Sequence, residues 1–243
     1  MCTVTFVPLK EKIFLVSNRD ERQWRLPAIP PQFYDFTSGK IYFPKDADEG
    51  GTWFAVHENG NILALLNGGF KNHIPQPRYE RSRGLILLDL AQTTNPFDNF
   101  RSINLENIEP FTLVLWSNEK LFECRWDGER KHSKQLDVSL PYIWSSATLY
   151  DDEAIARREN WFENWLDKHP EFTIDDILDF HQFNEDENRN KDLVLHQQDK
   201  IFTVSITGVE VSAGLAHLKY LDLLTNQVFL QNITFKKEII PNL

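Results

Sequence analysis

Residues 1–21, which read MCTVTFVPLKEKIFLVSNRDE, are the stretch on which the rest of the chain is organised. Two short apolar runs, at 3–7 and 13–16, flank the segment 8–11, Pro-Leu-Lys-Glu. Short β-rich runs on either side of such a break are typical of antiparallel strands joined by a turn. The stretch therefore predicts a β-hairpin with a four-residue loop.

The open end of this hairpin is expected to gather several reactive side chains. With the turn at its predicted place, opposite residues sum to about 19, so Cys2 lies beside Ser17. Side chains directly opposed across two strands have Cβ atoms about 5 Å apart. Cys2 would then be within reach of Asn18, Arg19 and Asp20. A thiol, an amide, a guanidinium and a carboxylate meet at one point.

These groups suit nucleophilic catalysis by a chain terminus. Removal of Met1 would give Cys2 a free α-amino group, which titrates at about 7.7–8.0 and can act as a base at neutral pH. Arg19 would favour the thiolate, and Asp20 would orient the ammonium. Asn18 could donate to a developing oxyanion. The alternative is that Cys2 simply begins a strand and that Arg19 and Asp20 form a surface ion pair.

Five short motifs follow in order along the chain: Met1-Cys2, Asn18-Arg19-Asp20-Glu21, Gly50-Gly51-Thr52-Trp53, Ala64-Leu65-Leu66-Asn67 and Arg81-Ser82-Arg83-Gly84. Together they resemble the signature of the NRDE family, also called the transport and Golgi organisation 2 family. The resemblance covers most of the chain and is strongest over residues 1–90.

The resemblance implies an N-terminal-nucleophile hydrolase fold, a four-layer αββα sandwich with mostly antiparallel sheets. Relatives with that fold include cysteine acylases that cleave linear amides, such as penicillin V acylase and bile-salt hydrolase. Members of the family itself are associated with haem trafficking, or with secretion and Golgi structure, rather than with an agreed reaction.

Composition narrows the class of protein. The 243 residues are 41% hydrophobic and 26% charged, which is ordinary for a globular domain, and we expect one domain over 1–243. A net charge of −10 argues against nucleic-acid binding. Two cysteines, Cys2 and Cys124, form no disulfide framework or zinc spacing, so no metal is expected. Because no leader or membrane-spanning run is evident, we expect a cytoplasmic protein.

The pattern of elements predicts an α+β layered sandwich rather than a doubly wound sheet. Hairpins come first, then helices, then hairpins again. Further hairpins are expected over 52–66 and 111–126, extended structure over 138–145, and late strands at 200–206, 215–224 and 227–235. Helices are expected at 83–92, at 151–169, and after a capping Thr173. Residues 184–192 are expected to form a loop.

Four further residues are candidates for the site. Asn67 ends a predicted strand and is a second candidate oxyanion donor. Gly68 frees the backbone for close approach to a ligand, or marks a bend without one. Trp53 could line a ligand cleft. Arg83 could hold a carboxylate of a ligand, or pin a loop.

Residues 22–50 are rich in proline and aromatic residues, and proline argues against a helix there. We expect a long aromatic loop that forms a lid or pocket wall, or else a packed surface loop. Trp24, Phe33, Tyr34 and Phe36 would supply its apolar surface.

The chain departs from the acylase pattern at two later positions. Ser146 stands where the family usually has an asparagine, and 211–214 reads Val-Ser-Ala-Gly where many members have a Gly-Thr-Arg motif. An oxyanion hole that lacks one donor typically loses about 100-fold or more in rate. These departures count against efficient acylase chemistry, but they leave Cys2, Arg19 and Asp20 unchanged.

Three functions fit these observations. The first is a cysteine amidohydrolase acting on a small non-peptide linear amide without a cofactor. The second is a non-catalytic protein of the same fold that binds or carries haem or another hydrophobic small molecule. The third is a protein-interaction module derived from an inactive enzyme.

Overall fold

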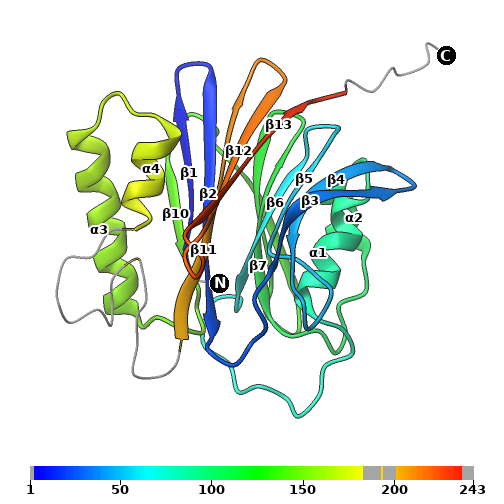
Figure 1. Ribbon diagram of the computed structural model, residues 1–243. Coiled ribbons are helices and arrows are strands. Elements are labelled where there is room, and N and C mark those ends of the chain that lie inside the picture. The colour runs from blue at the N-terminus through cyan, green and yellow to red at the C-terminus, as the bar shows by residue number, and fades with distance from the viewer. Residues whose placement is uncertain (1–2, 183–192, 194–200, 237–243) are drawn as a thin grey trace.

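The computed structural model describes residues 3–182, 193 and 201–236. Two β-sheets lie face to face, and helices cover the outer face of each sheet (Figure 1). Every pair of neighbouring strands is antiparallel within the described part of the chain. The predicted α+β sandwich of four layers, αββα, is confirmed.

The first sheet has six strands in the order β10-β1-β2-β11-β12-β13. The strands are β1 (Thr3–Leu9), β2 (Lys12–Arg22), β10 (Tyr142–Ser145), β11 (Ile201–Ser212), β12 (Leu215–Asp222) and β13 (Gln227–Thr234). Its centre is β2, which pairs with β1 on one side and with β11 on the other. The first hairpin is therefore part of the middle of this sheet.

The second sheet has seven strands in plain sequence order from β3 to β9. They are β3 (Ile29–Phe36), β4 (Gly39–Lys45), β5 (Phe54–His57), β6 (Ile62–Asn67), β7 (Phe111–Ser117), β8 (Lys120–Trp126) and β9 (Lys131–Leu136). The predicted hairpins β5–β6 and β7–β8 are both present. The first turns at Gly60 (φ 97°) and the second at Asn118 and Glu119 (φ 50° and 57°), where positive φ closes a tight turn.

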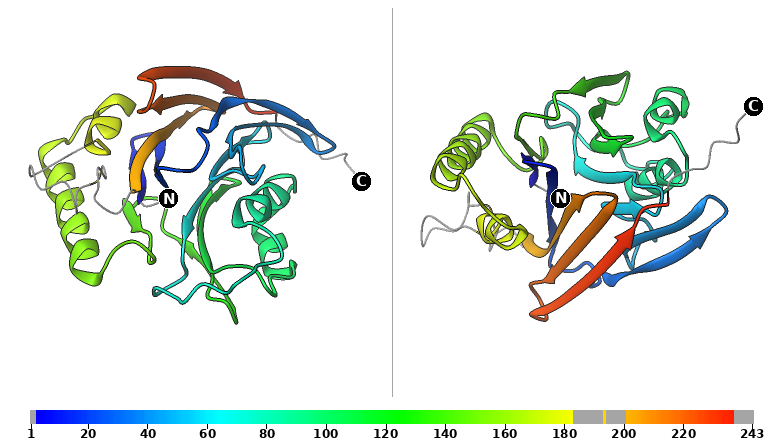
Figure 2. Two further views of the ribbon diagram at one scale, coloured as in Figure 1. Left: turned by 60° about the horizontal axis from the view of Figure 1, so that its bottom comes forward. Right: turned by 90° about the horizontal axis from the view of Figure 1, so that it is seen from above.

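Helices α1 (Arg83–Ala91) and α2 (Pro96–Ser102) cover the second sheet, while α3 (Asp152–Lys168) and α4 (Ile174–Phe180) cover the first (Figure 2). The predicted cap of α4 forms, since Thr173 makes a capping box with Asp176. Helix α3 is also capped, because Asp151 accepts from the Ala154 N–H. Ser82 stands at the N-cap of α1 without a side-chain cap bond. Sequence reasoning did not find α2.

The first hairpin is longer than expected and its turn is shorter. Strand β1 runs to Leu9 and β2 begins at Lys12, so the turn has two residues rather than four. Lys10 takes a left-handed conformation (φ 57°), which closes this tighter turn. Ser17 consequently pairs with Val4, two residues along from the partner expected. Residues 18–22 extend beyond the register with β1 and pair with β11.

The expected aromatic loop over residues 22–50 is wrong over most of its length. Strands β3 and β4 form a hairpin there, with Pro30 and Pro31 on β3. Strand β3 is the edge of its sheet, and an edge strand tolerates proline because one side needs no ladder hydrogen bond. A shift in register between Ile29 and Gln32 accommodates the two prolines.

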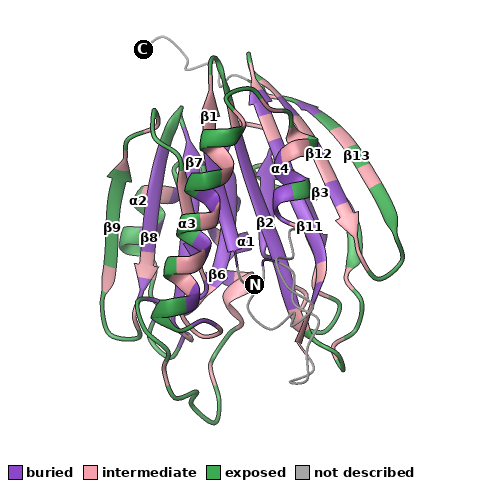
Figure 3. Cartoon of the chain, turned by 90° about the vertical axis from the view of Figure 1, so that its left-hand side faces the viewer, coloured by how far each residue is buried: buried purple, intermediate pink, exposed green. Residues whose placement is uncertain are grey.

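Burial follows the layers, with the most deeply buried side chains on the central strands of both sheets (Figure 3). One apolar cluster fills the space between the sheets and continues beneath α1, with Phe6, Phe54 and Phe111 fully buried. A second cluster lies beneath α3 and α4 and includes Phe14, Val16 and Phe162. The two faces of β2 therefore belong to different clusters, and its side chains alternate between them.

A glycine contact fixes α1 against the second sheet. A Cβ added at Gly51 would lie 2.5 Å from the Gly84 carbonyl carbon, and one added at Gly84 would lie 2.9 Å from the Thr52 backbone nitrogen. The Thr52 N–H donates to the Gly84 carbonyl at 3.3 Å. Only glycine allows this approach of two backbones. The contact explains why a glycine stands at position 51 in one motif and at position 84 in another. It also places the start of α1 beside Trp53.

A buried polar network docks α4 on the first sheet. His181, which has no exposed surface, donates from Nδ1 to Asn18 Oδ1 at 2.6 Å and accepts at Nε2 from the Thr5 hydroxyl at 2.8 Å. Asn18 Nδ2 donates to the carbonyls of His181 (3.1 Å) and Leu193 (2.8 Å). Burial lowers the pKa of His181 to about 3, so the imidazole is neutral at physiological pH.

We expect this histidine to make the fold sensitive to acid. In the unfolded chain His181 takes up a proton below about pH 6.5, whereas in the folded chain it stays neutral until the pH approaches its lowered pKa of about 3. Stability present above pH 6.5 is therefore lost as the pH falls, by about 2 kcal/mol between pH 7.5 and 5 from this group. Urea unfolding of wild type and His181→Gln at both pH values measures the difference.

The glutamine variant should lose less stability on acidification than wild type, because glutamine has no proton to take up. His217→Gln, on β12 outside the network, serves as the matched control and should retain the wild-type pH dependence. An identical pH dependence in wild type and His181→Gln would contradict the assignment.

Candidate functional site

A cavity of about 920 Å³ opens at the end of β2, where residues 19–22 extend beyond the part of the strand that pairs with β1. Its walls come from the end of β2, the turn before β5, the end of β6, the loop 72–85 and the segment around Thr148. Its size is that of a small-molecule site. Five residues expected from the sequence line it: Arg19, Asp20, Trp53, Asn67 and Arg83.

Arg19 is buried between the two sheets, with its side chain only 3% exposed. Its guanidinium carbon lies 4.1 Å from the centre of the Trp53 ring, and Nη2 lies 2.9 Å from Asp46 Oδ2. A guanidinium stacked on an indole and paired with a carboxylate is held in one orientation. The alternative of a surface ion pair for Arg19 is therefore excluded.

Asp46 is the partner that sequence reasoning missed. The same Oδ2 atom also accepts from Arg25 at 2.8 Å, while Oδ1 accepts from the backbone N–H groups of Asp48 and Glu49 at 3.0 Å. Burial would raise the pKa of the Asp46 carboxyl, but these hydrogen bonds and the charges of Arg19 and Arg25 hold it below its usual value. The pairing of Asp46 with Arg19 depends on the fold, because the two residues lie 27 positions apart in the sequence.

Asp20 is 3% exposed and faces the opposite side of the first sheet from Arg19. Its Oδ2 atom accepts from the Tyr150 hydroxyl at 3.2 Å, and Oδ1 accepts from the Thr203 hydroxyl. Thr203 is its cross-strand neighbour on β11. Neither Tyr150 nor Thr203 was predicted, since each is remote from Asp20 in sequence.

Asn67 ends β6 at the cavity wall and is half-buried. Its backbone carbonyl accepts from the Ser146 hydroxyl at 2.9 Å, which fixes the main chain. Among the described residues no hydrogen-bond partner occupies its side-chain amide. The amide N–H groups are therefore available to a ligand in the cavity.

Asn18 and Gly68 do not face the cavity in the way expected. Asn18 is fully buried on the α4 side of the sheet, and both of its amide N–H bonds go to carbonyls there. It has no side-chain donor left for an oxyanion. Gly68 takes φ 85°, and its N–H donates to the Pro110 carbonyl at 3.0 Å. The glycine serves a bend packed against Thr148 rather than an approach of backbone to ligand.

Arg83 lines the cavity but is engaged by a neighbouring loop. Its guanidinium pairs with Glu109 at 3.0 Å and donates to the Pro110 carbonyl at 3.2 Å. Burial lowers the pKa of Arg83, and the Glu109 charge opposes this effect. Glu109 also lies 3.3 Å from His73. Of the two roles considered for Arg83, its contacts favour pinning the loop.

Cys2 lies outside the described residues, so its role stays a prediction. The first described residue is Thr3, at the start of β1. Residues 18–22 of β2 extend past this end of β1. Cys124, in contrast, is buried in β8, and burial raises the pKa of its thiol to about 12.

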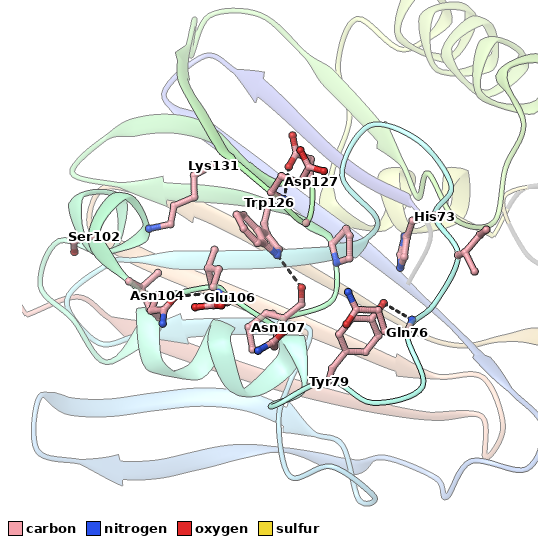
Figure 4. Close-up of a pocket in the computed structure, with 17 residues that line it drawn as sticks. His73, Gln76, Tyr79, Ser102, Asn104, Glu106, Asn107, Trp126, Asp127 and Lys131 are labelled. Atoms are coloured by element: carbon pink, nitrogen blue, oxygen red, sulfur yellow. Dashed lines mark hydrogen bonds between the residues drawn. The ribbon is translucent and has the colours of Figure 1, made fainter.

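A second cavity of about 730 Å³ lies between the loops 102–108 and 126–131 (Figure 4). His73 and Tyr79 line both cavities, so the loop 73–79 is the wall between them. None of the site residues predicted from the sequence lines this second cavity. The second cavity is therefore not a candidate site for chemistry that involves Arg19 and Asp20.

Neither a metal site nor a membrane-spanning helix is present in the described part of the chain. It holds no group of three or more His, Cys, Asp or Glu side chains arranged to bind a metal ion. None of its helices combines the length and the apolar character that crossing a membrane requires.

Solved structures with the same fold are found at low sequence identity. A mutant of conjugated bile acid hydrolase from Clostridium perfringens matches with a TM-score of 0.56 and 10% identity, over 99% of this chain and 100% of that chain. An N-acylethanolamine-hydrolyzing acid amidase orthologue from Caenorhabditis elegans matches with a TM-score of 0.59 and 11% identity, over 85% and 92%. At these identities the likeness shows the fold alone.

Comparison with curated proteins by sequence found no match. The family model described as Transport and Golgi organisation 2 matches residues 1–214, which is most of the chain. This match confirms the resemblance drawn from the five short motifs. The chain belongs to the Transport and Golgi organisation 2 family.

Proposed function

We propose that this protein is a cysteine N-terminal-nucleophile amidohydrolase that acts on a small, non-peptide linear amide. The observation that carries the proposal is the convergence of Arg19, Asp20 and the unengaged Asn67 amide on one cavity beside the start of β1. Of the proteins that share the fold, one is named as a hydrolase of conjugated bile acids and another as an amidase that hydrolyses N-acylethanolamines, which supports the reaction class.

In the proposed reaction, loss of Met1 frees the α-amine of Cys2, and this amine accepts the thiol proton. The Cys2 sulfur attacks the amide carbonyl, and Asn67 donates to the oxyanion that forms. The proton then passes to the leaving amine as the carbon–nitrogen bond breaks, which leaves a thioester on Cys2. Water hydrolyses the thioester and restores the thiol. Asp20 orients the ammonium form of the terminus, and Arg19 favours the thiolate.

Ligand binding without catalysis is the second candidate, and the cavity supports it less. Trp24 and Trp53 line the cavity, but Phe33, Tyr34 and Phe36, expected to line it, lie on β3 away from its walls. His73 is the one histidine of the described residues on its walls, and its Nε2 atom already lies 3.3 Å from Glu109. These residues do not form a haem site, so we derive no step through haem.

Haemin titration tests the second candidate directly. We expect no saturable Soret shift on adding haemin to the purified protein, because His73 is the one histidine among the described residues of the cavity wall, its Nε2 lies against Glu109 and its Nδ1 is buried. A saturable shift that is lost in His73→Ala would instead favour ligand binding.

The thiol reactivity of Cys2 tests the hydrolase. We expect intact-mass analysis to show loss of Met1, and brief treatment with iodoacetamide at pH 7 to add one label at Cys2. Cys124 should stay unlabelled, because burial keeps its thiol protonated and covered. A retained Met1 leaves the mechanism without its base and ends the proposal.

Hydrolysis tests the roles in the cavity. Fluorogenic acyl aminocoumarins with short to long acyl chains serve as probes. We expect Cys2→Ala to abolish release of the amine, and Asn67→Ala to reduce kcat about 100-fold through the lost oxyanion donor. Asn72→Ala, at the same cavity wall, is the matched control and should retain activity. Equal rates in Asn67→Ala and wild type would remove Asn67 from the mechanism.

The third hypothesis, a protein-interaction module, differs from the hydrolase proposal in the effect that it predicts for Cys2→Ala in the cell. If the protein acts only by binding a partner, Cys2→Ala leaves its biological activity unchanged. The hydrolase proposal requires that activity to be lost together with amine release.

A further inference from the structure

Both oxygens of the buried Asp20 carboxylate accept a hydroxyl hydrogen bond. Tyr150 approaches Oδ2 from the segment between β10 and α3, and Thr203 approaches Oδ1 from β11. Neither residue lines the cavity, whereas Asp20 does. The two hydroxyls therefore hold the carboxylate from behind while it faces the cavity.

The Thr203 contact depends on an irregularity in the sheet. Thr203 pairs with Asp20, and Ser205 pairs with Arg19, so β11 has one extra residue between these partners. Such a bulge re-aims side chains locally and is common beside functional sites. Here it brings a hydroxyl against Asp20 just where β2 delivers Arg19 to the other face.

Tyr150 is itself held by a buried charge. The guanidinium carbon of Arg158 lies 3.2 Å from the centre of the Tyr150 ring, and Arg158 has no exposed surface. A cation over the ring face attracts its electrons and makes the phenol hydroxyl a better donor. Asp151 caps α3 through the Ala154 N–H at 2.8 Å, which begins the helix directly after Tyr150. The ring, its cation and the helix start thus form one unit.

We propose that Tyr150 and Thr203 are positioning residues that fix the Asp20 carboxylate in one orientation, toward the N-terminal amine of the mature chain. The inference rests on the proposed function, because it gives Asp20 the N-terminal amine as its partner. Two hydroxyl donors from different segments, one to each oxygen, leave the carboxylate one orientation. Arg158 acts through Tyr150.

The test is the pH profile of Cys2 alkylation by iodoacetamide, followed by intact mass. The variants are Tyr150→Phe and Thr203→Val, each of which removes one hydroxyl and retains the shape. The matched controls are Tyr42→Phe, buried in the second sheet, and Thr207→Val, buried on β11. Thermal melting of each variant confirms that it is folded.

We expect each of the two variants to label Cys2 about 10-fold more slowly than wild type at pH 7. The midpoint of the profile should move upward, toward the value of about 8.5 of an ordinary cysteine. The controls should match wild type in both rate and midpoint. A purely structural role for the hydroxyls would lower the melting temperature without moving the midpoint.

The outcomes separate this inference from the proposed function. If wild-type Cys2 reacts no faster than the cysteine of the free peptide Cys-Thr-Val, the proposed function fails, and the inference falls with it. If wild-type Cys2 reacts fast and both variants retain its profile, the inference is overturned while the proposed function stands.

Discussion

The end of β2 carries two adjacent charges that the fold buries on opposite faces of one sheet. A buried charge is costly unless another group compensates it, so each face must supply partners. Arg19 meets Asp46 and Trp53 from the second sheet. Asp20 meets Tyr150 and Thr203 from the first sheet and the α3 layer. The site exists because one strand places consecutive residues into two different layers.

This constraint ties several distant segments to a single place. The turn that begins at Asp46 must return to β2 with its carboxylate bound by backbone N–H groups, because only then does it present Oδ2 to two arginines. The close contact of Gly51 with Gly84 then brings the start of α1 to the same cavity. Packing between the sheets and pairing of charges therefore act together, and neither alone would bring loop, strand and helix to one point.

Sequence reasoning found the elements whose signals are local. The α3 helix, the capping box at Thr173 and the tight turn at Gly60 each depend on residues a few positions apart. The β3–β4 hairpin was missed because its prolines argued against regular structure, and only its place at the sheet edge makes them tolerable. That residues 1–243 form one domain stays a prediction.

The site shows the same limit. Arg19, Asp20, Trp53, Asn67 and Arg83 were named from motifs and do line one cavity. Asn18 was grouped with them as a neighbour in sequence, but its amide is fully engaged beneath α4, where it accepts from His181 and donates to the carbonyls of His181 and Leu193. Asp46 lies 27 residues from Arg19, and Tyr150 and Thr203 lie 130 and 183 residues from Asp20, so no local pattern joins these pairs.

The two departures from the acylase pattern differ in weight once they are located. Ser146 is buried against the Asn67 backbone, so the substituted position still supports the remaining candidate oxyanion donor. Residues 211–214 lie at the β11–β12 turn, where Ser212 pairs with Lys12 at the end of β2 opposite to Arg19. An arginine at that turn would be remote from the cavity, so its absence there takes no charge from the site. In the proposed mechanism, the donor lost at Ser146 is therefore the departure that would bear on rate, and Asn67 would carry the oxyanion.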